Sequence, residues 1–216
     1  IAFIMNRGII IFSGLLIFVF AQIAAQESNG KRTYSRTLQA GREIRLEVNN
    51  RYGSIVIDNW DQDSVMISAT VEATAPDQTK MEKMLNGIDI DVHEEGTSVV
   101  VETLFDNEAR ILLETFKGFT GRIINYNSRL EINYEIKLPV HADIKIRNQF
   151  GDVSMGDNTG NVSVNLSNGN LSAKSLNRMS DLSLDFGEAV IESLNSGKIV
   201  TSFSKFRIAV CDDLSV

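Results

Sequence analysis

The sequence is poor in the residues that mark a disulfide-stapled or proline-rich protein. Its 216 residues include one cysteine and two prolines. The single cysteine, Cys211, excludes an internal disulfide, so packing and backbone pairing must hold the fold together. With 43% hydrophobic and 23% charged residues, the composition is typical of a folded chain of one or two domains. A net charge of −7 provides no basic surplus for binding nucleic acid.

Residues 1–25 have the pattern of a secretory signal. Arg7 provides a positive n-region, and the apolar run at 8–20 is short for a membrane span. Small residues precede a cleavage site before Gln26, and an uncleaved N-terminal anchor is the alternative. No cysteine lies near this point, which argues against a lipoprotein. We therefore expect an exported protein in the periplasm, on the outer-membrane surface or in the medium, with no stable membrane span after cleavage.

The last third of the chain has a period of 18 residues. The anchor positions are Gly151, Gly169, Gly187 and Lys205. The fifth position before each anchor is apolar: Ile146, Val164, Leu182 and Val200. The fourth position after each anchor is also apolar: Met155, Ala173, Ile191 and Ala209. A fixed period with apolar columns indicates stacked coils.

Within each unit apolar and polar residues alternate, as at 162–166 and 182–186, which predicts strands with one buried face. The predicted fold class is all-β: a β-solenoid, similar to a parallel β-helix, with repeats of about 18 residues, preceded by a β-rich region with one short helix. A meander of antiparallel hairpins is the alternative, because Asn168-Gly169 is also a hairpin signal.

The same unit occurs once far upstream. Residues 46–57 match residues 144–155 position by position, and both contain an aromatic residue followed by glycine. We expect the glycine to provide a backbone conformation or a close approach that a side chain would obstruct.

The region between these two units is less regular. A short helix is predicted at 77–86, with Asp77 as the N-cap, Met81, Met84 and Leu85 facing inward, and Gly87 as the stop. Strands are predicted at 65–71, 88–92, 99–104 and 130–138. For 106–126 two possibilities stay open, a helix lined by Ile111, Leu112 and Phe116 or a long loop.

We predict three parts: a signal peptide (1–25), an N-terminal β-rich region (26–139) and solenoid repeats (140–216). The sequence stops inside a repeat, so we expect further coils beyond Val216, because an uncapped end would expose apolar columns.

Three segments carry a resemblance to a known family: NNRYGSIVIDNW at 49–60, YEIKLPVHADIKIRNQFGDVSM at 134–155, and the LSNGNL and LDFGEAVI repeats. They resemble the bacterial exported β-strand-repeat proteins known as "putative adhesins", a family without an assigned biochemical activity. The resemblance implies a β-solenoid-like fold and a location in the cell envelope. Two features depart from the family: Lys205 stands in place of glycine, and 106–126 has no counterpart.

The sequence assigns no catalytic, cofactor-binding or metal-binding residue and no cofactor. It contains no nucleophile elbow, phosphate-binding loop or HExxH motif. His93 stands beside Glu94 and Glu95, but neighbouring strand residues point to opposite faces, so a solvated turn is the preferred interpretation. His141 is expected in a loop. Cys211, which the period aligns with Asp157, Ser175 and Ser193, is interpreted as structural.

Carboxylate pairs were considered because β-solenoids also carry polysaccharide-cleaving enzymes. Asp152 and Glu188 are two units apart with Asn170 between them, about 10 Å if coils stack at the usual strand spacing. This separation is too far for a retaining glycosidase and marginal for an inverting one. Asp212 and Asp213 alternate faces and are expected in solvent. Five asparagines could bind sugar hydroxyls or form ladders: Asn158, Asn161, Asn165, Asn168 and Asn170.

Two functions are compatible with these observations. The preferred one is a non-enzymatic envelope protein, an adhesin or surface-binding scaffold, whose partner is a surface or matrix ligand, either glycan or protein. The alternative is a polysaccharide-active lyase or glycosidase with its site at 105–130, where Phe105, Phe116, Phe119 and Tyr126 would stack on sugar rings. A structural envelope component without a ligand is a third possibility.

Overall fold

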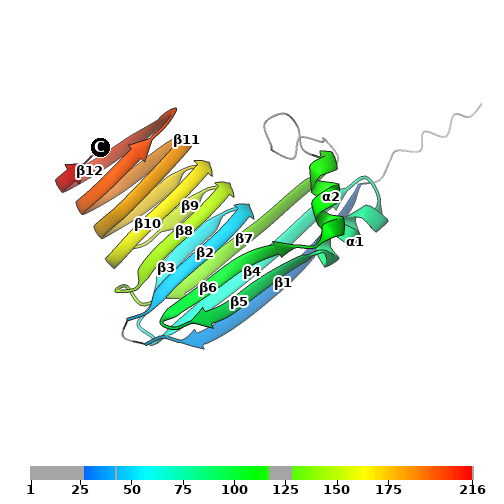
Figure 1. Cartoon of the computed structure of the whole chain (residues 1–216), viewed down its shortest axis with the longest axis horizontal. Coiled ribbons are helices and arrows are strands. Elements are labelled where there is room, and N and C mark those ends of the chain that lie inside the picture. The colour runs from blue at the N-terminus through cyan, green and yellow to red at the C-terminus, as the bar shows by residue number, and fades with distance from the viewer. Residues whose placement is uncertain (1–26, 42, 117–127, 216) are drawn as a thin grey trace, which may run out of the picture.

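The computed structural model describes residues 27–41, 43–116 and 128–215. The predicted signal segment lies outside these residues. In the described part of the chain, twelve strands and two helices follow one another (Figure 1). The strands are β1 (Ser28–Gln39), β2 (Arg45–Tyr52), β3 (Ile55–Asn59), β4 (Ser64–Ala75), β5 (Ile88–Glu95), β6 (Ser98–Phe105), β7 (Arg129–Leu138), β8 (Asp143–Phe150), β9 (Val153–Met155), β10 (Asn158–Asn168), β11 (Leu171–Thr201) and β12 (Ser204–Ser215). The helices are α1 (Gln78–Asn86) and α2 (Asn107–Phe116).

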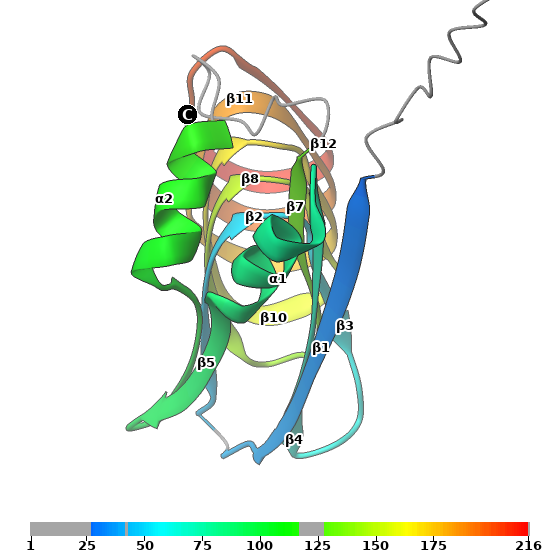
Figure 2. The same cartoon turned by 90° about the vertical axis from the view of Figure 1, so that its right-hand side faces the viewer.

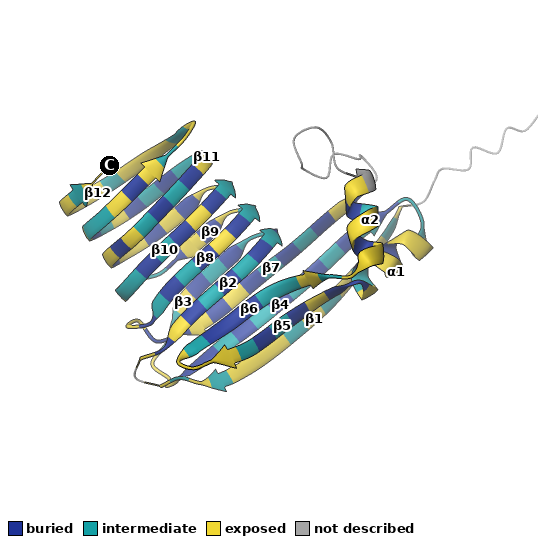
Figure 3. Ribbon diagram, viewed as in Figure 1, coloured by how far each residue is buried: buried dark blue, intermediate teal, exposed yellow. Residues whose placement is uncertain are grey.

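The predicted strands of the irregular region are confirmed, within β4, β5, β6 and β7. In β4 and β7 buried and less buried residues alternate along most of the strand. Period-two patterns place every second side chain on the inner face. Figure 3 shows these alternating bands crossing neighbouring strands.

All twelve strands of the described residues join one sheet. Its order is β1-β4-β7-β3-β9-β11-β10-β8-β2-β6-β5, with β12 beside β11. β4 pairs antiparallel with β1 and β7, as β5 does with β6, and the remaining pairs are parallel. The sheet curls until β1 and β5, the two ends of this order, face each other (Figure 2).

The predicted β-solenoid is therefore wrong as a fold class. The sheet is mixed and nearly closed into a barrel shape, and it carries two helices instead of one. The 18-residue period correctly predicted strands that pair in parallel. It could not predict the antiparallel pairs of β1, β4 and β7 or of β5 and β6, because these strands lie outside the repeats. Strands from both sides of residue 139 also share this sheet, since β2 lies between β6 and β8.

The 18-residue offset is confirmed in the pairing of the central strands. Val164 lies beside Ile146 and Leu182. The upstream unit has the expected register as well, with Leu46 beside Ile144 and Ile55 beside Val153.

The fourth unit does not keep this offset. Between β11 and β12 it falls to 17 residues, because Ile191 lies beside Ile208. Ser204, and not Lys205, therefore faces Gly187, and Cys211 faces Leu194 instead of continuing the predicted polar column. Val200 is 50% exposed and does not extend the buried column.

Helix α1 has the predicted caps and inner face. The Asp77 carboxylate accepts a hydrogen bond from the Lys80 amide at 2.8 Å, and the Gly87 amide donates to the Lys83 carbonyl. Met81 and Met84 are buried, as the spacing of apolar residues requires. For 106–126, the helix alternative is correct over Asn107–Phe116, but Ala109 and Leu113 face the core while Ile111 is 67% exposed.

Candidate functional site

Aromatic side chains at the ends of strands β2 and β8 lie in contact with each other. Tyr52 ends β2 and Phe150 ends β8, in register with each other. Their rings are stacked, with centroids 5.7 Å apart and an interplanar angle of 9°. Phe105 of β6 meets Tyr52 edge to face at 6.2 Å. Parallel, in-register pairing explains this stack, because equivalent side chains of neighbouring strands lie directly over one another.

Glycines make these turns possible. Gly53 and Gly151 have φ values of 108° and 140°, which L-residues with a side chain rarely adopt. A Cβ atom at Gly151 would come within 2.0 Å of the Gly53 carbonyl oxygen, and one at Gly169 within 2.2 Å of the Gly151 carbonyl oxygen. The predicted role of the glycine, conformation or close approach, is confirmed on both counts.

The stack continues as a row that runs across the strands, from β2 and β8 to β10 and β11. Asn168 lies beside Phe150 and beside Phe186. Phe186 stacks on Phe203, with centroids 5.5 Å apart, and these two rings are 53% and 88% exposed. We call this set the aromatic row: Tyr52, Phe150, Asn168, Phe186 and Phe203. Phe203 lies outside the repeat pattern, so its place could not be recognised from the sequence.

A hollow of about 580 Å³ lies next to the buried end of the row. Its lining comes from both aromatic–glycine turns and from β7: Tyr52, Gly53, Ser54, Arg129, Leu130, Glu131, Asn133, Phe150, Gly151 and Asp152. An adjoining hollow of about 410 Å³ shares Arg129 and Glu131 with it and extends over β1 and β4. The two hollows therefore meet at the start of β7.

Hydrogen bonds and an ion pair fix the polar side chains that line the hollow. The Asn133 Oδ1 atom accepts hydrogen bonds from the Ser54 amide at 2.8 Å and from its hydroxyl at 2.9 Å. Arg129 Nη2 lies 2.5 Å from Glu131 Oε1, and the hydrogen bond from this guanidinium raises the pKa of Arg129. The hollow thus presents an amide, two carboxylates and a guanidinium beside an aromatic face.

Tyr52 is the most buried aromatic residue of the hollow, with 4% of its surface exposed. Burial raises the pKa of its hydroxyl, and the Arg51 guanidinium, 5.3 Å from the ring centroid, acts in the opposite direction. The buried Tyr52 Oη atom forms no hydrogen bond of good geometry.

A row of acids and amides runs beside the glycines. Asp152 Oδ1 accepts hydrogen bonds from the Asn170 amide at 2.8 Å and from its side chain at 3.1 Å. Asn170 Oδ1 accepts from the Glu188 amide at 3.0 Å, and Glu188 pairs with Arg207 at 3.5 Å. The predicted order of Asp152, Asn170 and Glu188 is confirmed, and the amide of Asn170 separates the two carboxylates.

The remaining asparagines do not gather at one site. Asn158 is buried and donates to the Ala142 carbonyl at 2.9 Å. Asn161 Oδ1 accepts from Arg178 at 3.2 Å. Asn165 is exposed and lies between Arg147 and Ser183 in the sheet.

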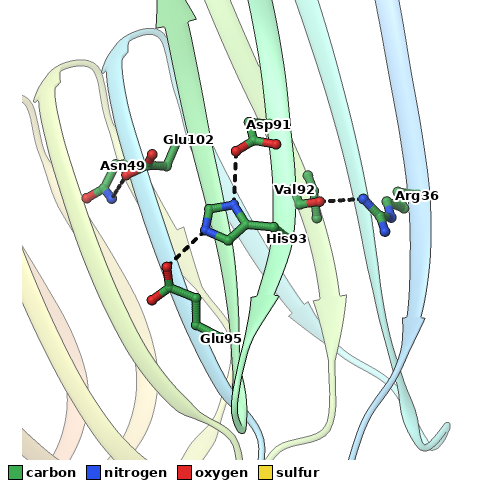
Figure 4. A network of polar contacts seen from close by, with 7 residues as sticks. All are labelled: Arg36, Asn49, Asp91, Val92, His93, Glu95 and Glu102. Carbon is green, nitrogen blue, oxygen red and sulfur yellow. Dashed lines mark hydrogen bonds and ion pairs between the residues drawn. The ribbon is translucent and has the colours of Figure 1, made fainter.

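His93 lies in strand β5, and not in a turn as predicted. Figure 4 shows its ring between Asp91 and Glu95, the residues two positions away that share its face. Its ring nitrogens lie 2.9 Å from Asp91 Oδ2 and 3.3 Å from Glu95 Oε1. The hydrogen bond to Glu95 and the charge of Asp91 raise the pKa of His93. Among the described residues, no group of three or more His, Cys, Asp or Glu side chains could hold a metal ion.

A second polar cluster lies on the same outer face of the sheet. Glu47 accepts from Lys145 at 3.1 Å and from Arg147 at 2.5 Å. Burial raises the pKa of Glu47, but these two hydrogen bonds and the charges of Lys145 and Arg147 together outweigh it, so the net pKa is lowered. Asn49 donates to Glu102 at 2.9 Å (Figure 4). The cluster ties β2, β6 and β8 together.

The other predicted candidates lie apart from these clusters. His141, Cys211, Asp212 and Asp213 are exposed. Phe105 packs on Tyr52, Phe116 ends α2, and Phe119 and Tyr126 lie outside the described residues. No helix in the described ranges is long and apolar enough to cross a membrane.

Comparisons with known proteins place this chain in no family. No family model and no curated protein matches it. Among solved structures, it is similar to a "putative cell adhesion protein" from Clostridium sporogenes, at 10% identity and a TM-score of 0.47, over 86% of this chain and 100% of that one. It is also similar to a "putative adhesin" and a "putative lipid binding protein" from Parabacteroides distasonis, each at 9% identity, with TM-scores of 0.28 and 0.24. Each of these alignments covers 85% of this chain and 96% of that one.

Proposed function

We propose that this chain is an exported, non-enzymatic binding protein of the cell envelope whose aromatic row and adjoining hollow hold an extended glycan. The observation that carries the proposal is the aromatic row itself. Stacked rings and an amide lie in one row across the strands, and two of the rings are exposed. Exposed aromatic residues gathered in one place mark binding surfaces more often than packing.

The chemistry of this row fits a sugar chain. The apolar C–H groups of pyranose rings pack against aromatic side chains, and their hydroxyls need donors and acceptors together. The row provides the rings, and Asn133, Asp152 and Asn170 provide amide and carboxylate groups beside them. Neighbouring strands repeat about every 4.8 Å, a spacing close to the length of one pyranose unit. A linear glycan that runs across the strands therefore meets one member of the aromatic row at each step.

Export is supported by the sequence of residues 1–25, with its positive n-region and short apolar run. An acidic net charge agrees with a partner other than nucleic acid. The periplasm, the outer-membrane surface and the medium all remain within this proposal.

The test is binding of the purified chain from Gln26 onward to an array of neutral and acidic glycans. Phe186→Ala removes an exposed ring of the row, and Phe206→Ala is its matched control, since Phe206 is 39% exposed on β12 outside the row. We expect the first variant to lose at least about tenfold in affinity and the second to keep it. Absence of glycan binding, or an equal loss in both variants, would contradict the proposal.

A polysaccharide-cleaving activity is the second candidate, because the carboxylates of Glu131 and Asp152 line the same hollow. Paired carboxylates are the machinery of glycosidases. Release of reducing ends from the bound glycans, lost in Glu131→Gln and Asp152→Asn but kept in Phe206→Ala, would replace the binding proposal with this one. We expect binding without release.

A further inference from the structure

A row of polar side chains accompanies the aromatic row. Hydrogen bonds link Asp152 to Asn170 and Asn170 to Glu188. Lys205 comes next, because it lies beside Glu188 where β11 pairs with β12. We call this set the polar row: Asp152, Asn170, Glu188 and Lys205. Phe150 and Asp152 line the same hollow, so the two rows border the same space at that end.

The charge of the polar row changes sign from one end to the other. Among the described residues, Asp152 has no cationic partner and accepts hydrogen bonds from Asn170. Glu188 is paired with Arg207 at 3.5 Å. Lys205 is exposed and forms no ion pair within the part of the chain that the structure describes. A ligand that lies along the two rows therefore meets a carboxylate at the hollow and an ammonium group at β12.

The ammonium end of the polar row is also the exposed end of the aromatic row. Phe186 precedes Glu188 by two residues, and Phe203 precedes Lys205 by two residues. The rings of Phe186 and Phe203 are stacked and exposed, whereas Tyr52 at the other end of the row is buried. An exposed aromatic surface and an unpaired cation therefore lie close together.

The backbone holds Phe203 in an unfavourable conformation at this end. Its φ is 52°, a left-handed value that bulky side chains rarely adopt. The Ser202 amide donates to the Leu184 carbonyl at 2.8 Å, and the Ser204 hydroxyl donates to the Ser202 carbonyl at 2.9 Å. Strained residues persist only where their surroundings enforce them, and they collect at functional sites. The turn thus keeps an exposed ring stacked on Phe186.

This arrangement favours an acidic sugar at the exposed end and neutral sugars at the hollow. The C–H groups of a pyranose ring pack against an aromatic side chain, and a carboxylate on that ring accepts a charge-assisted hydrogen bond from a lysine ammonium group. At the hollow, the Asp152 carboxylate would repel a second acidic sugar. Arg129 does not offset this repulsion, since its guanidinium is already paired with Glu131.

Building on the proposed function, we propose that the glycan has a single acidic sugar at one end and neutral sugars along the rest of its length. The acidic sugar packs on Phe186 and Phe203, and its carboxylate accepts a hydrogen bond from Lys205. The neutral sugars continue along the aromatic row to the hollow. Lys205 is then the residue that determines the specificity of the site for the acidic end.

The test uses the purified chain from Gln26 onward and an array on which each linear glycan is printed in three forms. The first form is neutral throughout, the second has one uronic or sialic acid at its end, and the third has a uronic acid at every position. We expect the second form to bind about fivefold more tightly than the other two at low ionic strength, as an exposed ion pair allows. This preference should vanish in about 1 M sodium chloride, which screens surface charges.

The outcomes separate this inference from the proposed function. If no form binds, both are overturned. If the neutral form binds as tightly as the second form, or the third binds most tightly, only the acidic-end inference is overturned.

Variants of Lys205 assign the preference to its charge. We expect Lys205→Gln to weaken binding of the second form about fivefold and to leave binding of the neutral form unchanged. Lys205→Glu should make the neutral form the preferred one. Lys198→Gln is the matched control, since Lys198 is an exposed lysine of β11 outside the polar row, and it should change neither form. A preference for the second form that survives in Lys205→Gln overturns the role of this residue.

Discussion

At the scale of single residues, the stacked glycines have the least tolerance for change. We expect Gly151→Ala to destabilise the protein by about 3 kcal/mol, because it combines a positive φ with a Cβ against backbone. Urea unfolding measures the loss. Gly41→Ala is the matched control, since a Cβ there meets nothing within 4 Å, and its effect should stay within about 0.5 kcal/mol. Equal stability of both variants would contradict the role assigned to the glycine stack.

His93 provides a prediction about pH. Its pKa is raised above the ordinary value of 6.5 by Glu95 and Asp91, so the folded state binds the proton more tightly than the unfolded state. The stabilisation is therefore fully present below pH 6.5 and is lost as the pH rises through the raised pKa. An NMR titration of the ring should show a pKa above 6.5, and Glu95→Gln should lower it. A pKa unchanged by Glu95→Gln would rule out this partner as the cause.

The residues of the candidate site were only partly predictable. The aromatic–glycine pairs at 52–53 and 150–151 repeat in the sequence and could be aligned. The hollow beside them could not be predicted, because Arg129, Glu131 and Asn133 come from β7, whose contact with the turns depends on sheet order. His93 was misjudged for a simpler reason: adjacent acids were considered, whereas Asp91 and Glu95, two residues away, share its face.

At the scale of elements, one partly buried polar network joins strands that lie far apart in the sheet order. Tyr134 of β7 and Thr103 of β6 form a hydrogen bond of 2.6 Å, and Thr103 donates to Asn50 Oδ1 at 3.1 Å. The threonine hydroxyl has one proton, so Tyr134 is the donor to Thr103. Burial raises the pKa of Tyr134 to about 12, which keeps it protonated as this role requires.

We expect Tyr134→Phe to cost about 1 kcal/mol and Thr103→Val more, about 2 kcal/mol, because the second change leaves the buried Tyr134 hydroxyl without a partner. The double variant should cost less than the sum of the two. Urea unfolding of the four proteins forms a double-mutant cycle that measures this coupling. If the losses of the two single variants add exactly in the double variant, the hydrogen bond between Tyr134 and Thr103 does not contribute to stability.

Elements with strong local signals were predictable, and those without were not. Helix α1 combines an N-cap, an apolar stripe and a terminal glycine, and all three are confirmed. The sequence did not predict strand β1. Its inner face has few apolar residues and includes Gly30, Arg32 and Arg36, so hydrophobic and polar residues do not alternate visibly along it. β1 is the end strand of the sheet order and pairs on one side only, so its inner face is less buried than that of β4.

At the scale of the whole molecule, the 18-residue period predicted which strands pair in parallel but not that the sheet nearly closes into a barrel. In-register parallel pairing at an offset of 18 residues follows from the apolar columns, as Val164 between Ile146 and Leu182 shows. The mixed sheet depends on antiparallel pairs whose register is set by contacts distant in sequence, such as Val71 with Ile132. Such pairs leave only ordinary alternation in each strand, which is compatible with many orders.

The order of strands predicts that the N-terminal β-rich region does not fold by itself. Strand β2 lies between β6 and β8, and β3 lies between β7 and β9. In a fragment of residues 27–139, β2 would lack its partner β8 and β3 would lack its partner β9. We expect a fragment of residues 27–139 to be unfolded, with a poorly dispersed NMR spectrum, because the buried faces of Leu46, Val48 and Ile55 would lie at open edges. Adding a fragment of residues 140–216 should restore dispersion if the two associate through the β2–β8 and β3–β9 pairs. A well-dispersed spectrum from residues 27–139 alone would contradict this expectation, and the shared sheet would then be an interface between two domains that meet at residue 139.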